Sequence, residues 1–107
     1  MTKAIFIGEQ KHNIRDVDID LSVENNQLYN VLGGKATFIG QWPDIDVVIV
    51  KRIDADLVNE NKLPPPFDEE DVRGPILLIR MDEDSEPQDF TLREFRRLRR
   101  WNECFTV

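Results

Sequence analysis

Hydrophobic and polar residues alternate along residues 14–21, where valine, isoleucine and leucine point one way and three aspartates point the other. A period of two is typical of a strand with one face toward solvent. Residues 3–7 form a second apolar run, and a polar segment at 9–13 separates the two runs. We therefore expect residues 3–7 and 14–21 to pair as an antiparallel hairpin.

Three later segments also have the composition of strands. Residues 35–42 alternate less regularly and end before a tight turn at Pro43. Residues 45–53 and 75–81 each contain four consecutive branched or leucine side chains, so they are apolar on both faces. Strands of this kind belong in the centre of a sheet.

Two segments have the spacing of amphipathic helices. The first is residues 23–32, with Ser22 as its N-cap and Gly33 and Gly34 as a left-handed stop. The second, residues 92–101, follows Thr91, which forms a capping box with Glu94. Phe90 and Phe95 have the spacing of a hydrophobic staple. The apolar stripe that this helix turns toward the core is Leu92, Phe95, Leu98 and Trp101.

The elements run in the order strand, strand, helix, strand, strand, loop, strand, helix. This order predicts an α+β fold, with two layers, about five largely antiparallel strands and both helices on one face of the sheet. The loop, residues 54–74, has no periodicity and is unusually long for a compact domain. A length of 107 residues fits one such domain, 1–107.

Charge is spread unevenly over the chain. The net charge of −7 opposes contact with nucleic acid or an anionic membrane. Residues 92–101 nevertheless hold five arginines against one glutamate, whereas residues 54–89 hold twelve acids against three bases. Cys104 is the only cysteine, and no apolar run is long enough for a signal peptide or a membrane span, so we expect a cytoplasmic protein.

The sharpest candidate site is the side of the last helix that carries its arginines. We call it the arginine face; it comprises Arg93, Arg96, Arg97, Arg99 and Arg100. One interpretation is contact with the phosphates of a nucleic acid. The other is a solvated face that pairs with the acidic segment 82–89, with a neighbouring subunit or with a protein partner, and the acidic body favours this second interpretation.

A second candidate is the proline loop, which comprises Leu63, Pro64, Pro65, Pro66 and Phe67. Its composition is that of proline-rich ligands that dock in aromatic grooves. It also fits a stiff loop segment whose hydrophobic ends pack against the body of the domain. Both interpretations stay open.

Other chemistry has little support. The acids at 16, 18 and 20 and at 82–86 could bind a divalent cation or imitate the charges of the DNA backbone. They lack the spacing and the glycine of a calcium loop. His12 is the only histidine, and no nucleophile and base are visible as a pair. The glycines at 33 and 34 end a helix, so they do not cradle phosphate. We expect no enzyme activity, no cofactor and no metal.

Several positions share a layout with a known family. They are the strand at 14–19 that runs into Ser22, the helix end Leu32-Gly33-Gly34, the asparagine-bearing loop with prolines at 59–66, Gly74-Pro75-Ile76-Leu77-Leu78-Ile79, and Phe90-Thr91. The layout resembles an uncharacterised family of small phage and bacterial domains of unknown function. The resemblance implies an origin in a virus or mobile element and assigns no functional residue. The arginine face and the triple proline depart from the family.

These observations favour a non-enzymatic protein-interaction module that binds a protein partner or itself, with a homodimer as one form. One alternative is nucleic-acid binding through the arginine face. Another is an acidic DNA mimic or a protein that binds divalent cations. The expected interaction surface is the arginine face together with the proline loop.

Overall fold

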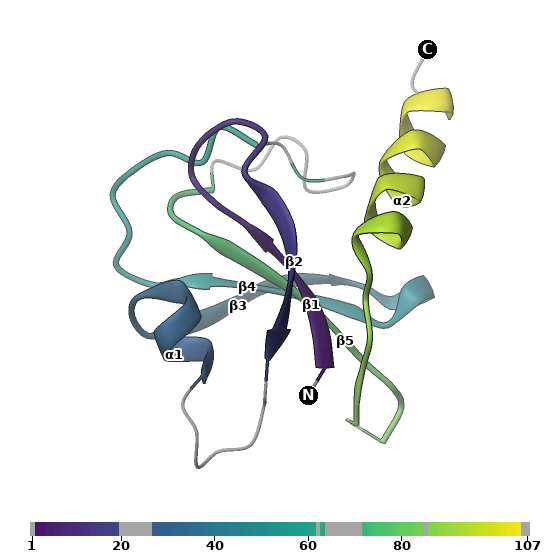
Figure 1. Cartoon of the computed structure of the whole chain (residues 1–107), viewed down its shortest axis with the longest axis horizontal. Coiled ribbons are helices and arrows are strands. Elements are labelled where there is room, and N and C mark those ends of the chain that lie inside the picture. Colours follow the sequence, from purple (N-terminus) through teal and green to yellow (C-terminus); the bar gives the residue numbers. More distant parts are fainter. Residues whose placement is uncertain (1, 20–26, 62, 64–71, 85, 106–107) are drawn as a thin grey trace.

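The computed structural model describes residues 2–19, 27–61, 63, 72–84 and 86–105, and of residues 27–29 and 99–105 it describes the backbone only. The fold is mixed α/β, with an open antiparallel sheet and two helices (Figure 1). In chain order the elements are β1 (Thr2–Ile7), β2 (Ile14–Ile19), α1 (Gln27–Leu32), β3 (Ala36–Trp42), the 3-10 turn η1 (Pro43–Ile45), β4 (Val47–Arg52), β5 (Ile76–Met81), β6 (Pro87–Gln88) and α2 (Leu92–Phe105).

The sheet has the strand order β2, β1, β5, β4, β3, and the two-residue β6 pairs with the end of β5. Each of these pairings is antiparallel. β5 lies between β1 and β4, so that Ile5, Leu78 and Ile49 form one row across three strands. Residues 76–79 are at most 1% exposed, which confirms the prediction of a central strand there.

The two helices cover opposite faces of the sheet, and the expectation that they share one face is wrong. Phe95 of α2 packs with Ile76 and Leu78 of β5, whereas Leu32 of α1 packs with the alternate residues Leu77 and Ile79. In Figure 1 the helices stand on different sides of the sheet, α1 at the left and α2 at the right. The reason is physical: a strand that is apolar on both faces needs cover on both.

The start of α2 is built as its sequence predicts. The Glu94 backbone N–H donates to the Thr91 hydroxyl at 3.3 Å, which confirms the capping box. The Phe90 and Phe95 rings meet edge to face with centroids 6.4 Å apart, which confirms the staple. The Glu94 carboxylate accepts from the Thr91 hydroxyl, at 3.3 Å, where a standard capping box uses the backbone N–H. The helix continues to Phe105.

α1 ends at the expected glycine pair. Gly33 has a φ of +77°, the left-handed conformation that stops a helix. A Cβ on Gly34 would lie 2.8 Å from Cδ of Arg52. The second glycine therefore leaves room for the Arg52 side chain of β4, which packs against the backbone at this position. The predicted start at 23 and the Ser22 cap lie outside the described residues.

Part of the long loop 54–74 is tied to the sheet by one buried amide. Asn59 is 8% exposed, and its Nδ2 donates to the carbonyl of Gly74 at 2.9 Å and to that of Ile7 at 3.4 Å. Its Oδ1 accepts from the backbone N–H of Asn61 at 2.8 Å. This amide therefore links the loop to the ends of β1 and β5.

A second asparagine fixes the turn between β1 and β2. Nδ2 of Asn61 donates to the carbonyls of Gly8 and Gln10 at 2.9 and 2.8 Å, and its Oδ1 accepts from the His12 N–H at 2.8 Å. His12 has a φ of +68°, a conformation that needs such support in a residue other than glycine. The described part of the loop thus stabilises the turn between β1 and β2 through these hydrogen bonds.

Candidate interaction surface

α2 is amphipathic, and its solvent side carries the described part of the arginine face. Phe95 is 1% exposed in the core, and Leu92 packs beside it. The arginine side chains on the opposite side of the helix are all exposed: Arg93, Arg96 and Arg97. The side chains of Arg99 and Arg100 lie outside those described. These three arginines face solvent, as the helical spacing predicts.

Two carboxylates of the acidic segment 82–89, those of Asp82 and Asp89, accept hydrogen bonds from groups outside the arginine face. Asp82 accepts from the N–H groups of Asp84 and Glu86 at 3.0 and 2.9 Å, and from the amide of Gln88 at 3.1 Å. Asp89 accepts from the backbone N–H of Lys3 at 2.9 Å. Among the side chains that the structure describes, the ion pairs involve other basic residues than the three exposed arginines of α2.

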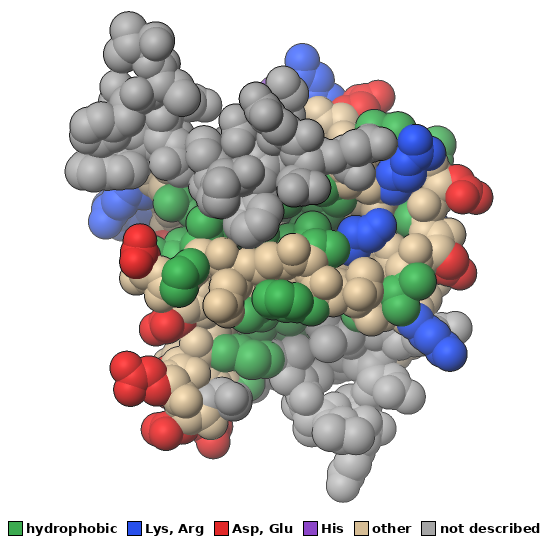
Figure 2. Space-filling model, turned by 180° about the vertical axis from the view of Figure 1, so that it is seen from behind, with side chains coloured by type: hydrophobic (Ala, Val, Ile, Leu, Met, Phe, Trp, Pro, Cys, Tyr) green, Lys and Arg blue, Asp and Glu red, His purple; other side chains and the backbone are tan. Residues whose placement is uncertain are grey.

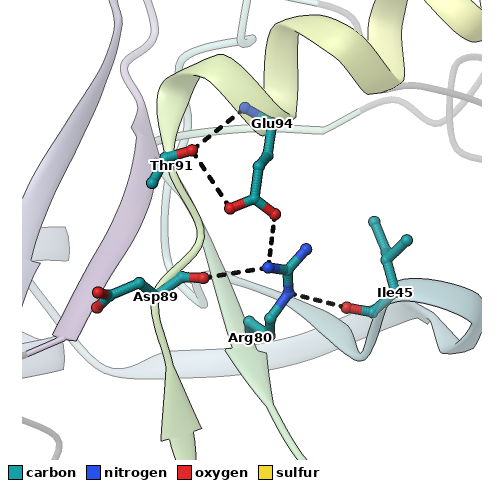
Figure 3. Close-up of polar contacts among 5 residues, drawn as sticks. All are labelled: Ile45, Arg80, Asp89, Thr91 and Glu94. Carbon is teal, nitrogen blue, oxygen red and sulfur yellow. Dashed lines mark hydrogen bonds and ion pairs between the residues drawn. The ribbon is translucent and has the colours of Figure 1, made fainter.

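Glu94, the acid in the first turn of α2, is occupied by Arg80. Glu94 lies 2.6 Å from the Arg80 guanidinium, which also donates to the carbonyls of Ile45 at 3.1 Å and Asp89 at 3.2 Å (Figure 3). The guanidinium also stacks 5.0 Å from the centre of the Phe90 ring. Arg80 therefore joins β5, η1 and the entry to α2, and it removes Glu94 from the arginine face.

A small hollow opens beside the arginine face. We call it the α2 hollow; it is lined by His12, Ile14, Leu92, Phe95 and Arg96 and has a volume of about 200 Å³. Ile14, Leu92 and Phe95 are the apolar residues of its lining, and Arg96 and His12 are the polar ones. A hollow of this mixed lining can take a hydrophobic group that stands next to a negative charge.

A larger hollow of about 430 Å³ lies on the opposite face, between the end of α1 and the turn after β1. Phe6, Val31 and Leu57 contribute apolar surface, and Glu9 and Arg52 also line it. Oε2 of Glu9 and Nε of Arg52 have no hydrogen-bond partner among the described residues, and Nε lies 3.6 Å from the Asp54 carboxylate. Both atoms are closed to solvent, so a molecule in this hollow would not reach them.

The structure divides the proline loop. Leu63 is 3% exposed and belongs to the core on the α2 side of the sheet, so it offers no surface to a partner. One hydrophobic end of the proline loop therefore packs against the body of the domain. Pro64, Pro65, Pro66 and Phe67 lie outside the described residues. The surface proposed below therefore does not include this loop.

The acid clusters do not gather into a metal site in the described part of the chain. Within it, no three side chains of histidine, cysteine, aspartate or glutamate lie close enough to hold one ion. Asp18 pairs with Lys3 at 3.4 Å across the β1–β2 hairpin, and Asp82 caps its own loop. Asp20 lies outside the described residues. None of the helices in the described part is long and apolar enough to cross a membrane.

The sequence predicted the exposed arginines of the last helix but not the residues that lie beside them in the fold. Ile14 and His12 stand about eighty residues before α2 in the chain, and only the fold brings them beside Arg96. The alternation in residues 14–21 does mark Ile14 as the start of a strand, but no local signal says which helix will pack beside it. The role of Arg80 could not be predicted either, because its partners lie in η1 and at the entry to α2, far apart in the sequence.

The architecture is that of a small mixed α/β domain whose last helix is rich in arginine. Residues 5–98 match the model of a family of unknown function, DUF5880, so the chain belongs to that family. This match confirms that the chain resembles a family of unknown function. Neither a curated protein nor a solved structure matches the chain.

Proposed function

We propose that this chain is a non-enzymatic protein-interaction domain that binds an acidic segment of a partner protein through α2. One observation supports this most directly: Arg96, an exposed arginine of α2, lines a hollow together with Ile14, Leu92 and Phe95, and it is not paired with an acid of the described residues. A guanidinium group without an acid beside it at the rim of a hollow is suited to recognise a carboxylate.

The partner segment would place one apolar side chain in the α2 hollow and carboxylates against Arg96 and Arg93. The apolar contact supplies most of the binding free energy, since rim charges contribute little by themselves. The net charge of −7 repels an acidic partner at long range, so the attraction is confined to this face. We expect modest affinity that weakens as salt concentration rises.

The test is a selection from a random peptide library displayed on phage, followed by fluorescence anisotropy with the selected peptides. We expect enriched peptides to carry a hydrophobic residue flanked by aspartate or glutamate. Arg96→Glu should weaken their binding about tenfold or more, because the carboxylate then meets a like charge. Lys35→Glu, an equal change of charge at an exposed site on another element, should leave binding unchanged.

Enrichment of peptides without acids, or equal binding to the Arg96→Glu variant, would contradict the proposal. Nucleic-acid binding is the second candidate, because exposed arginines on a helix also suit phosphates. Gel shifts with duplex DNA and with RNA at low salt distinguish the two. A shift that disappears steeply with salt and with Arg96→Glu would favour the nucleic acid over the peptide.

The cytoplasmic location and the origin in a virus or mobile element belong to this proposal as well. The location is supported by the single cysteine, and the origin by the layout of the chain described above. An acidic protein with a lone thiol is suited to a reducing compartment. Fluorescence microscopy of a tagged full-length chain in its natural host tests the location directly.

A further inference from the structure

The two outer edges of the sheet differ in a way that bears on assembly. β2, at one edge, carries Arg15, Asp16 and Asp18, and charged side chains of this kind discourage other strands from adding to an edge. β3, at the other edge, has seven residues and none of them is charged. Proteins usually protect an edge of this length, because its free N–H and C=O groups attract another strand.

β3 also presents apolar surface. Phe38 in its middle is 59% exposed, a large fraction for an aromatic side chain. Figure 2 views the molecule from behind, where hydrophobic side chains lie along an open run of backbone across the middle of the face. Among the described residues, the feature that protects β3 is a bulge between Phe38 and Gly40, which shifts the register against β4 by one residue.

We propose that two copies of this chain pair through β3, antiparallel to each other, about a twofold axis that passes between Ile39 and Gly40. The two sheets then become one continuous sheet, and the backbone N–H and C=O groups of the two β3 edges hydrogen-bond to each other. A twofold pairing of identical edges is the simplest closed assembly. This inference goes beyond the proposed function, since α2 and the α2 hollow take no part in it.

The bulge selects this register. Ile39 and Trp42 pack in the α2-side core, and Gly40 pairs with Ile49 on that same side, whereas Phe38 pairs with Val50 and faces the α1 side. Residues opposite each other in an antiparallel pair must point to the same face. An axis between Ile39 and Gly40 meets this condition along the whole strand. The resulting opposite positions are Phe38 and Gln41, Thr37 and Trp42, and Ile39 and Gly40.

Charge at the two ends of β3 favours the antiparallel orientation. Lys35 immediately precedes the strand and is exposed, and Asp44 is exposed in η1 immediately after it. In the proposed pair, Lys35 of each copy lies beside Asp44 of the other, so two opposite-charge contacts form. A parallel pairing would instead place like charges together. Each contact is weak, but the two together set the orientation.

Sedimentation velocity of the full-length chain over a wide concentration range tests the proposal. We expect a reversible dimer. Phe38→Lys should weaken it, because the variant puts a charge on the open edge. Lys35→Asp alone and Asp44→Lys alone should each raise the dissociation constant about tenfold, since each creates two like-charge contacts. The double variant Lys35→Asp/Asp44→Lys should dimerise like the original chain, because both opposite-charge contacts return.

Glu83→Lys is the matched control for Asp44→Lys, with the same charge change at an exposed site in the acidic loop, and it should leave the dimer intact. Circular dichroism checks that each variant folds, and the charge-swap series does not depend on Phe38→Lys folding. A chain that stays monomeric at every concentration would overturn the proposal. So would a dimer that is indifferent to Lys35→Asp, or one that the double variant does not restore.

Discussion

Arg80 and Asn59 donate hydrogen bonds to backbone carbonyl groups that take no part in the hydrogen bonding of the regular elements. Arg80 donates to the carbonyls of Ile45 and Asp89, and Asn59 donates to that of Gly74. A polar backbone group that is buried without a partner costs about 1–3 kcal/mol. Each side chain therefore stabilises a junction between elements, and neither is needed for any one element by itself.

Replacing Arg80 should destabilise the fold, because Arg80 joins β5, η1 and the entry to α2. Arg80→Ala should lower the free energy of unfolding by about 2 kcal/mol, since two carbonyls lose their donor and a partly exposed ion pair is lost. Equilibrium unfolding in urea measures this loss. Arg93→Ala, at an exposed position on α2, is the control and should change stability by less than about 0.5 kcal/mol. Equal losses in both variants would refute the structural role of Arg80.

At the scale of elements, the side chain of α2 that is described as fully buried against the sheet lies in its first turns. Phe95 is 1% exposed and meets Phe90 edge to face, whereas Leu98, one turn later, is only half-buried. In Figure 1 the far end of α2 extends beyond the sheet. Among the described side chains of α2, Phe95 is therefore the main anchor of the helix that carries the arginines.

Truncation of these two side chains should have unequal effects. Phe95→Ala should lower the free energy of unfolding by about 3–5 kcal/mol, because it leaves a cavity in the core. Leu98→Ala should lower it by only about 1 kcal/mol, since the side chain already meets solvent. Urea unfolding of both variants measures the difference. A loss for Leu98→Ala as large as that for Phe95→Ala would mean that α2 packs along its whole length.

Signals that operate within a few residues predicted the elements well. Thr91 with Glu94, Phe90 with Phe95, and Gly33 each act over five residues or fewer, and all three are found as expected. The placement of α1 was missed although residues 76–79 are apolar on both faces and thereby require cover on both. Such a pattern says that a second layer exists, but it does not say which helix forms it.

Contacts between distant residues could not be read from the sequence. Asn61 bonds to Gly8 and Gln10, which lie about fifty residues earlier, and nothing in their local composition marks them as partners. The candidate site has the same limitation. Helical spacing identified the exposed arginines, whereas the lining of the α2 hollow depends on β2 standing beside α2. The free edge of β3 likewise appears only once the strand order is known.

At the scale of the whole molecule, the two proposed contacts lie on separate elements. The arginine face is on α2, and the pairing edge is β3, at the end of the sheet order. Sites that share no partner and lie well apart act independently in free energy. A dimer through β3 would carry two copies of the α2 hollow, which strengthens binding to a partner with two acidic segments.

A substitution at one of the two surfaces should therefore leave binding at the other surface unchanged. Arg96→Glu should abolish most peptide binding and leave the dimerisation constant within about twofold of the original. Lys35→Asp should do the reverse. Anisotropy and sedimentation on the same protein samples measure both quantities. A single substitution that removes both activities in a folded chain would show that the two surfaces are coupled.

β5 is the last long strand in the chain, yet it lies in the middle of the sheet between β1 and β4. During synthesis, the two hairpins β1–β2 and β3–β4 emerge first and have no strand to join them. Until residues 76–81 leave the ribosome, each hairpin keeps an inner edge and apolar faces open to other nascent chains. The protein is consequently most prone to aggregate before its translation is complete, and a pause in translation ahead of residue 76 would prolong that interval.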